Sequence, residues 1–108
     1  MGLNPLEARE TLGSGGALLD VREDEEWEAG HAPEAVHVPL TGLEARIDEV
    51  PRDRDVVVVC RSGARSSKAI SVLEGAGLSL YNLDGGMKAW AKAGLPVVRE
   101  DGGKGRIS

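Results

Sequence analysis

A run of four valines, Val56–Val59, limits the folds open to this chain more than any other feature of its sequence. β-Branched residues favour strands, and a strand without polar residues at alternate positions is buried on both faces. Such strands are typical of parallel sheets that carry helices on both sides. The run therefore predicts that Asp55–Val59 is the central strand of an α/β domain.

Segments with helical and strand character alternate along the rest of the chain. Asn4 followed by Pro5 is typical of a helix N-cap with proline at the first helical position. The helices that we predict cover residues 5–12, 24–29, 41–49, 64–74 and 87–93. The other strands that we predict cover residues 17–21, 35–38 and 78–82, with a candidate edge strand at 97–99. This alternation predicts an α/β fold with a mainly parallel central sheet flanked by helices.

The length of 108 residues is enough for one domain and too short for two. We predict that residues 1–100 form this domain. The last residues, 101–108, contain little apolar material, so we expect a flexible tail that does not pack. The small size and the charged composition favour a monomer.

Composition and charge exclude several classes of function. The formal net charge of −5 argues against general nucleic-acid binding. The N-terminus lacks the basic region and long apolar core of a secretory signal, and the longest apolar run, Val56–Cys60, is too short to span a membrane. A single cysteine in a small acidic chain indicates a reducing compartment, so we expect a cytoplasmic protein without membrane contact.

Cys60, the only cysteine, ends the valine run and precedes a short loop and a predicted helix. Open parallel sheets bind ligands at the carboxyl ends of their strands, where this thiol is expected to lie. Backbone N–H groups of the loop and the positive end of the helix can converge there. With Arg61 and Arg65 beside it, Cys60 is expected to have a lowered pKa and to react as a thiolate. The alternative is an inert thiol in the core.

Three segments, in order, resemble the signatures of the rhodanese family. The first, residues 18–39, contains Asp-x-Arg, an acidic–aromatic pair, Gly-His-x-Pro and a strand that ends in proline. The second is the loop that begins at Cys60, and the third is Gly-Gly-x-x-x-Trp within residues 82–90. Glu34 and His37 depart from the family pattern, in which glycine and asparagine are common at these positions.

The resemblance implies a single rhodanese-like domain that acts as a thiosulfate-type sulfurtransferase. Such proteins take a sulfane sulfur from a small anionic donor such as thiosulfate and hold it as a persulfide on the cysteine. They pass it to a thiol, cyanide or a protein acceptor, without a metal or an organic cofactor. Cys60 is then the nucleophile, and Asp20 and Arg22 are expected to form an ion pair that supports its loop. The resemblance implies a loop that binds the donor, formed by Arg61, Ser62, Gly63, Ala64 and Arg65, with a solvated side chain as the alternative for Arg61.

Loop length separates sulfur from phosphate chemistry. Four residues stand between Cys60 and Arg65, whereas phosphatases and arsenate reductases of the same superfamily carry one more. The shorter loop fits a single sulfur atom, with Gly63 allowing the tight bend and the arginines attracting an anionic donor. Two alternatives remain open. One is a sulfur-carrier or docking module fed by a partner persulfide, and the other is a small phosphatase or arsenate reductase, against which the loop length speaks.

The remaining notable residues have structural interpretations that we favour. His31 is expected to make a turn-stabilising hydrogen bond rather than to act as a general base. Trp27 and Trp90 are expected in the core, and Glu23–Glu26 on a solvated helix start, where acidic side chains favour the helix dipole. Two histidines and one cysteine do not give the spacing of metal ligands, so no metal is assigned.

Overall fold

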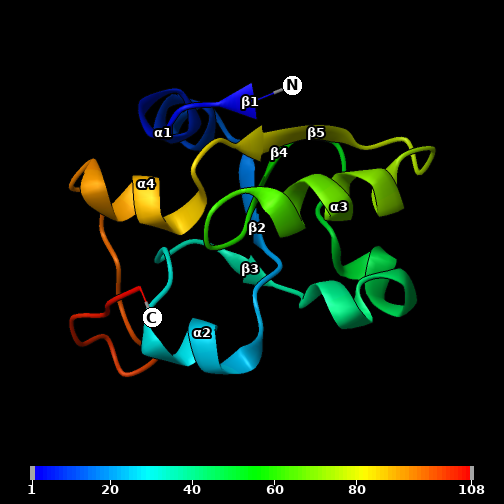
Figure 1. Ribbon diagram of the computed structural model, residues 1–108. Coiled ribbons are helices and arrows are strands. Elements are labelled where there is room, and N and C mark those ends of the chain that lie inside the picture. The colour runs from blue at the N-terminus through cyan, green and yellow to red at the C-terminus, as the bar shows by residue number, and fades with distance from the viewer. Residues whose placement is uncertain (1, 108) are drawn as a thin grey trace.

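The computed structural model describes residues 2–107 and confirms the α/β fold. Its centre is a five-stranded sheet in the order β1-β5-β4-β2-β3, in which all neighbouring strands are parallel (Figure 1). The strands are β1 (Gly2–Leu3), β2 (Ala17–Asp20), β3 (Val36–His37), β4 (Asp55–Val59) and β5 (Ser79–Leu83). The helices are α1 (Pro5–Gly13), α2 (Asp24–Ala29), α3 (Ala64–Leu73) and α4 (Gly86–Lys92), with 3-10 segments η1 (Leu40–Gly42) and η2 (Glu44–Glu49).

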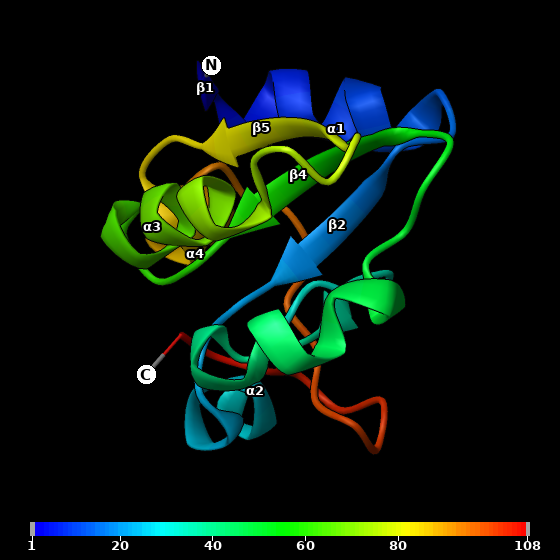
Figure 2. The same ribbon diagram turned by 90° about the vertical axis from the view of Figure 1, so that its right-hand side faces the viewer.

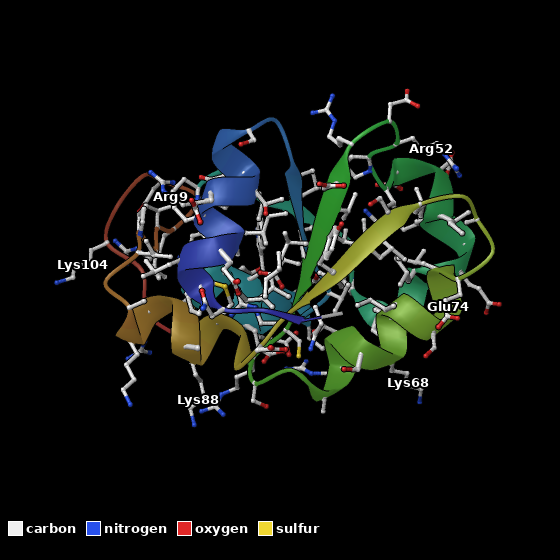
Figure 3. All side chains as sticks on the ribbon, turned by 90° about the horizontal axis from the view of Figure 1, so that it is seen from above. Arg9, Arg52, Lys68, Glu74, Lys88 and Lys104 are labelled. Carbon is white, nitrogen blue, oxygen red and sulfur yellow. The ribbon has the colours of Figure 1, made fainter. Side chains whose placement is uncertain are left out.

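The strand β4 occupies the middle of the sheet, as the valine run predicts. It pairs with β2 on one side and with β5 on the other, where Val58 lies opposite Asn82. All four valines have 0% exposure. Because side chains alternate along a strand, Val56 and Val58 face α3, and the other two valines face α1 and α4. Figure 3 shows α3 on one side of the sheet and α1 and α4 on the other.

Helices cover both faces of the sheet and close two layers of core. On one face, Ala69 and Leu73 of α3 pack with the inward side chains of β2 and β4. On the other face, Ala8 of α1 packs with Met87 and Trp90 of α4. The short helix α2 lies beyond the carboxyl end of β2 (Figure 2), so it borders the edge of the sheet at which Cys60 is expected. Among the helices of residues 2–107, none is both long and apolar enough to cross a membrane.

The α-helix predicted over residues 41–49 is wrong. Two 3-10 segments, η1 and η2, occupy this stretch, and Arg46 has non-helical dihedrals of φ −118° and ψ 25°. The apolar positions were read correctly, because Leu43 is buried and Ile47 packs against the core. Arg46 pairs with Glu49 at 2.8 Å. Residues three apart eclipse one another in a 3-10 helix, so this pair suits the tighter coil.

The end of the C-terminal segment contacts the domain, so the expectation that residues 101–108 do not pack is wrong for residues 105–107. The Arg106 N–H donates at 3.0 Å to the last carbonyl of α2. Ile107 packs against the core layer that contains α4. Composition could not reveal this docking, because much of it uses backbone groups. Ser108 lies outside the described residues.

The other predicted elements agree with the structure to within one residue, apart from two short segments. The candidate edge strand at 97–99 is not a strand, since Val98 makes isolated antiparallel bridges to His31 and Lys104. The two-residue strand β1 was not predicted, because two residues carry no periodicity. It extends the sheet beside β5 and does not alter the edge at which the site lies.

Candidate active site

Cys60 lies directly after β4, at the carboxyl edge of the sheet (Figure 1). Its side chain is 1% exposed and belongs to the core layer beneath α3. Gly63 is the N-cap of α3 and has a φ of 115°, a left-handed conformation that glycine adopts without a Cβ clash. The Gly63 N–H donates to Cys60 Sγ at 3.0 Å. The loop thus folds its backbone around the sulfur atom.

Hydrogen bonds around this sulfur favour its ionised form. Burial raises the pKa of Cys60, but hydrogen bonds from the Ser66 side chain and from the backbone of Ser66, Gly63 and Ser62 outweigh burial, so the pKa lies below its ordinary value. Ser66 Oγ lies 3.5 Å from Cys60 Sγ. The direction agrees with the sequence-based expectation. The cause differs, because neutral hydrogen-bond donors rather than the arginines are the main lowering influences.

The first turn of α4 is joined to the backbone of the Cys60 loop. The Met87 N–H donates to the Cys60 carbonyl at 2.8 Å, and the Lys88 N–H donates to the Arg61 carbonyl at 3.1 Å. Gly86 has a φ of 61°, and a Cβ there would stand 2.5 Å from the carbonyl oxygens of Cys60 and Arg61. The Gly-Gly-x-x-x-Trp motif therefore has a physical role, because a glycine at 86 lets α4 hold the loop directly.

Arg65 forms a two-pronged ion pair with Glu26 of α2. Its NH1 and NH2 groups donate to the two carboxylate oxygens at 2.6 and 2.7 Å, with side chains 35% and 18% exposed, respectively. The side-chain hydrogen bond from Arg65 is the largest influence that lowers the pKa of Glu26. The expectation that Glu23–Glu26 is simply solvated is therefore wrong for Glu26. No signal in the sequence links this acid to an arginine 39 positions later.

The ion pair expected between Asp20 and Arg22 is present, and both side chains have 0% exposure. Arg22 donates from Nε and NH2 to the carboxylate at 2.8–3.1 Å. Its remaining donors reach the Gly30 carbonyl at 2.8 Å and the Glu26 carbonyl at 3.4 Å. The Asp20–Arg22 pair therefore connects the end of β2 to the C-terminal part of α2. Glu26, the acid that pairs with Arg65, also lies on α2.

The two tryptophans lie in different environments. Trp90 is buried, as expected, and its indole N–H donates to the Pro96 carbonyl at 2.9 Å. Trp27 is not in the core. It stacks between the rings of His31 and His37, with centroid distances of 3.6 and 4.5 Å. His31 Nδ1 also lies 2.8 Å from the Trp27 carbonyl, which is the turn-stabilising contact expected for this histidine.

The other loop residues differ in exposure, and one residue near the site was not predicted from the sequence. Ser62 and Ala64 are exposed, whereas Arg61 is half-buried. Asn82, at the end of β5, contacts Ser66 Oγ through its amide oxygen. A polar residue at an inward position of a strand was the available signal. Among residues 2–107, no group of three or more histidine, cysteine or acidic side chains is placed to hold a metal ion.

The chain is a parallel α/β domain of the class that carries a cysteine in a tight loop at the carboxyl edge of its sheet. The sequence matches the family model of the rhodanese-like domain over residues 4–93. The chain therefore belongs to the rhodanese-like family, as its motifs predict.

Known proteins similar to this chain differ in length and in name. A sulfurtransferase of Allochromatium vinosum is 44% identical over 79% of this chain and 80% of its own length. An HTH-type transcriptional regulator of Mycobacterium tuberculosis is 42% identical over 74% of this chain, which spans only 36% of that protein. The crystal structure of a rhodanese-related protein from Thermoplasma volcanium superposes with a TM-score of 0.84 at 30% identity, covering 92% of this chain and 98% of that one.

Proposed function

We propose that this protein is a sulfurtransferase that carries a sulfane sulfur as a persulfide on Cys60. The donor is thiosulfate or a persulfide, and the acceptor is a thiol, cyanide or a thiol of another protein. The observation that carries this proposal is the environment of the sulfur. A buried cysteine whose pKa is lowered, with an N–H donor 3.0 Å from Sγ, suits a thiolate nucleophile better than an inert thiol.

The transfer consists of two displacements at sulfur. In the first, the Cys60 thiolate attacks the outer sulfur of thiosulfate, a new S–S bond forms, and the old one breaks with its electron pair leaving on sulfite. In the second, the acceptor attacks the terminal sulfur of the persulfide and the Cys60 thiolate leaves. With cyanide as the acceptor the product is thiocyanate. Charge and atoms balance in each step without a cofactor.

The backbone of the loop supports the charged intermediate. The persulfide places negative charge on a sulfur just beyond Sγ, and we propose that N–H groups between Arg61 and Arg65 face that position, as in an anion nest. Ser62, Gly63 and Ala64 supply such groups at the start of α3. The positive end of the helix acts in the same direction.

A sulfur carrier fed by a protein persulfide is the second candidate, and the Arg65–Glu26 pair favours it. Thiosulfate is a dianion, and the guanidinium that we expected to attract it is already bonded to a carboxylate at 2.6 Å. A donor that brings less charge depends less on this arginine. The two candidates share the Cys60 persulfide and differ in what loads it. In either case we propose that the protein is a monomer and that it lies in the cytoplasm, a reducing compartment in which its thiol stays free.

Intact-mass spectrometry tests the proposal directly. The protein is treated with thiosulfate, weighed, treated with cyanide and weighed again, with Cys60→Ser in parallel. Gain of one sulfur atom that cyanide removes as thiocyanate, absent from the variant, is the expected result. A variant that still gains the sulfur refutes the role of Cys60. Loading by a small-molecule or protein persulfide without loading by thiosulfate selects the carrier.

A further inference from the structure

Three polar side chains stand in a row at the carboxyl edge of the sheet. Cys60 follows β4, Ser66 lies in the first turns of α3, and Asn82 stands near the end of β5. Ser66 has 0% exposure. Its Oγ lies 3.5 Å from Cys60 Sγ and 3.0 Å from the Gly63 carbonyl oxygen, and it makes a short hydrogen bond with Asn82 Oδ1. One buried hydroxyl therefore connects the thiol to the amide.

The hydroxyl of Ser66 has one proton for three neighbours. When Cys60 is a thiol, its S–H donates to Ser66 Oγ, and Ser66 is free to donate its own proton to Asn82 Oδ1. When Cys60 loses its proton, the sulfur becomes an acceptor, and Ser66 must turn its O–H towards it. The Ser66 oxygen and the Asn82 oxygen then face each other without a proton between them. Two acceptors in contact, one on a buried side chain and one on a half-buried side chain, are unfavourable.

An amide can remove this conflict, because it carries an acceptor and a donor side by side. A half-turn about the Cβ–Cγ bond of Asn82 replaces Oδ1 by the Nδ2 group, which donates to Ser66 Oγ. The contact that holds Nδ2 in its present place is a 3.5 Å approach to Asp84 Oδ1, at the long limit of a hydrogen bond. Little is therefore lost when the amide turns. A carboxylate or an apolar side chain at position 82 could not serve both states.

We propose that Asn82 is a positioning residue that acts on Cys60 through Ser66, accepting a hydrogen bond from the Ser66 hydroxyl when Cys60 is a thiol and donating one to Ser66 Oγ when the sulfur is negatively charged. This inference rests on the proposed function, in which Cys60 cycles between a thiolate and a persulfide. The charged groups around the three side chains are Arg65, which is paired with Glu26, Arg61 in the loop, and Asp84 beyond β5.

The pH dependence of alkylation tests the proposal, because iodoacetamide can report on only one cysteine in this chain. Asn82→Asp keeps the acceptor, removes the donor and has nearly the same size. At pH values below the midpoint of the Cys60 titration, we expect this variant to be alkylated about tenfold more slowly than wild type. This corresponds to a rise of about one unit in the pKa of Cys60. Asn82→Ala removes the donor and the acceptor together, so we expect a smaller fall of about threefold, because Ser66 loses its donor in the charged state without facing a competing acceptor.

A double-mutant cycle separates action through Ser66 from the effect of the added charge. In a Ser66→Ala background the change Asn82→Asp is expected to have less than about a threefold effect, since the connecting hydroxyl is gone. A tenfold effect that persists there, or an Asn82→Asp rate equal to wild type, overturns the proposal.

The wild-type protein offers a readout that does not depend on the folding of variants. The side-chain amide resonances of Asn82 in a ¹⁵N NMR spectrum are expected to shift with the same midpoint as the alkylation of Cys60. Resonances that stay fixed across that midpoint refute the turning amide. Sulfur loading is measured separately, so a protein that shows this coupling but gains no sulfur refutes the proposed function while leaving the role of Asn82 intact.

Discussion

Replacing Glu26 by glutamine tests what the ion pair with Arg65 does. Glutamine keeps the size of the side chain and one acceptor oxygen, but it places an amide N–H₂ group against a guanidinium that can only donate. Loss of one partner of a fully buried pair costs about 3–5 kcal/mol, and exposed pairs contribute about 0.2–1 kcal/mol. The side chains are 35% and 18% exposed. We therefore expect Glu26→Gln to lower the free energy of unfolding by about 1–2 kcal/mol.

The same change is expected to speed the loading of sulfur from thiosulfate. Without its carboxylate partner, the Arg65 charge acts on the incoming anion. Two unit charges about 4 Å apart in water attract by about 1 kcal/mol, which is about a fivefold gain in rate. Salt reduces this gain. Urea unfolding and initial rates of loading at low ionic strength measure the two effects. Glu25→Gln, on the exposed neighbouring position of α2, is the matched control.

The pH dependence of the free energy of unfolding is a third test of the Glu26–Arg65 ion pair. Glu26 has a pKa below its ordinary value of 4.5, chiefly because of the hydrogen bond from Arg65. A carboxyl whose folded-state pKa is lowered contributes stability above its unfolded value, and the contribution is lost as the pH falls through the folded value. The free energies of unfolding of wild type and Glu26→Gln should therefore approach each other as the pH falls below 4.5. A variant that is as stable as Glu25→Gln at neutral pH and loads no faster would show that the pair has neither role.

Three further predictions concern the support of the loop. Asp20→Asn leaves the Arg22 charge buried without a carboxylate and should cost about 3–5 kcal/mol in urea unfolding; a cost below that of an exposed pair would contradict this. Gly86→Ala brings a Cβ against the Cys60 carbonyl, so we expect a loss of about 1–3 kcal/mol together with slower alkylation of the thiol. Cys60→Ser should abolish sulfur loading with little change in melting temperature, and unfolding of this variant would be visible by circular dichroism.

The sheet could be predicted from the sequence because its signals are local. A buried strand of valines, glycines after helices and an N-cap before proline each act within a few residues. Their order then determines a parallel sheet, and a thiol after the central strand comes to lie at its carboxyl edge. Apolar residues three and four apart are typical of an α-helix, so nothing in residues 41–49 indicates that Arg46 leaves the helical region and that 3-10 segments form instead.

The contacts that define the site could be predicted only in part, because they join distant segments. The Asp20–Arg22 pair was foreseen since its members are two residues apart on one strand end. Glu26 and Arg65 are brought together by the sheet, and nothing near either residue announces the other. The docking of residues 105–107 likewise depends in part on backbone hydrogen bonds, which carry no compositional signal.

Two ion pairs lie beside the loop, and they bear on what lowers the pKa of Cys60. Asp20 pairs with Arg22, and Glu26 pairs with Arg65. Arg22 joins the two pairs through a hydrogen bond to the backbone carbonyl of Glu26. The two pairs fix the position of α2 against α3, and the Arg65 charge is held by a carboxylate rather than left to act on the sulfur alone. The pKa of the thiol is lowered instead by neutral N–H and O–H groups at contact distance. Such groups act on whichever sulfur species occupies the loop, so in the transfer that we propose the same environment stabilises the thiolate before the first displacement and the persulfide after it.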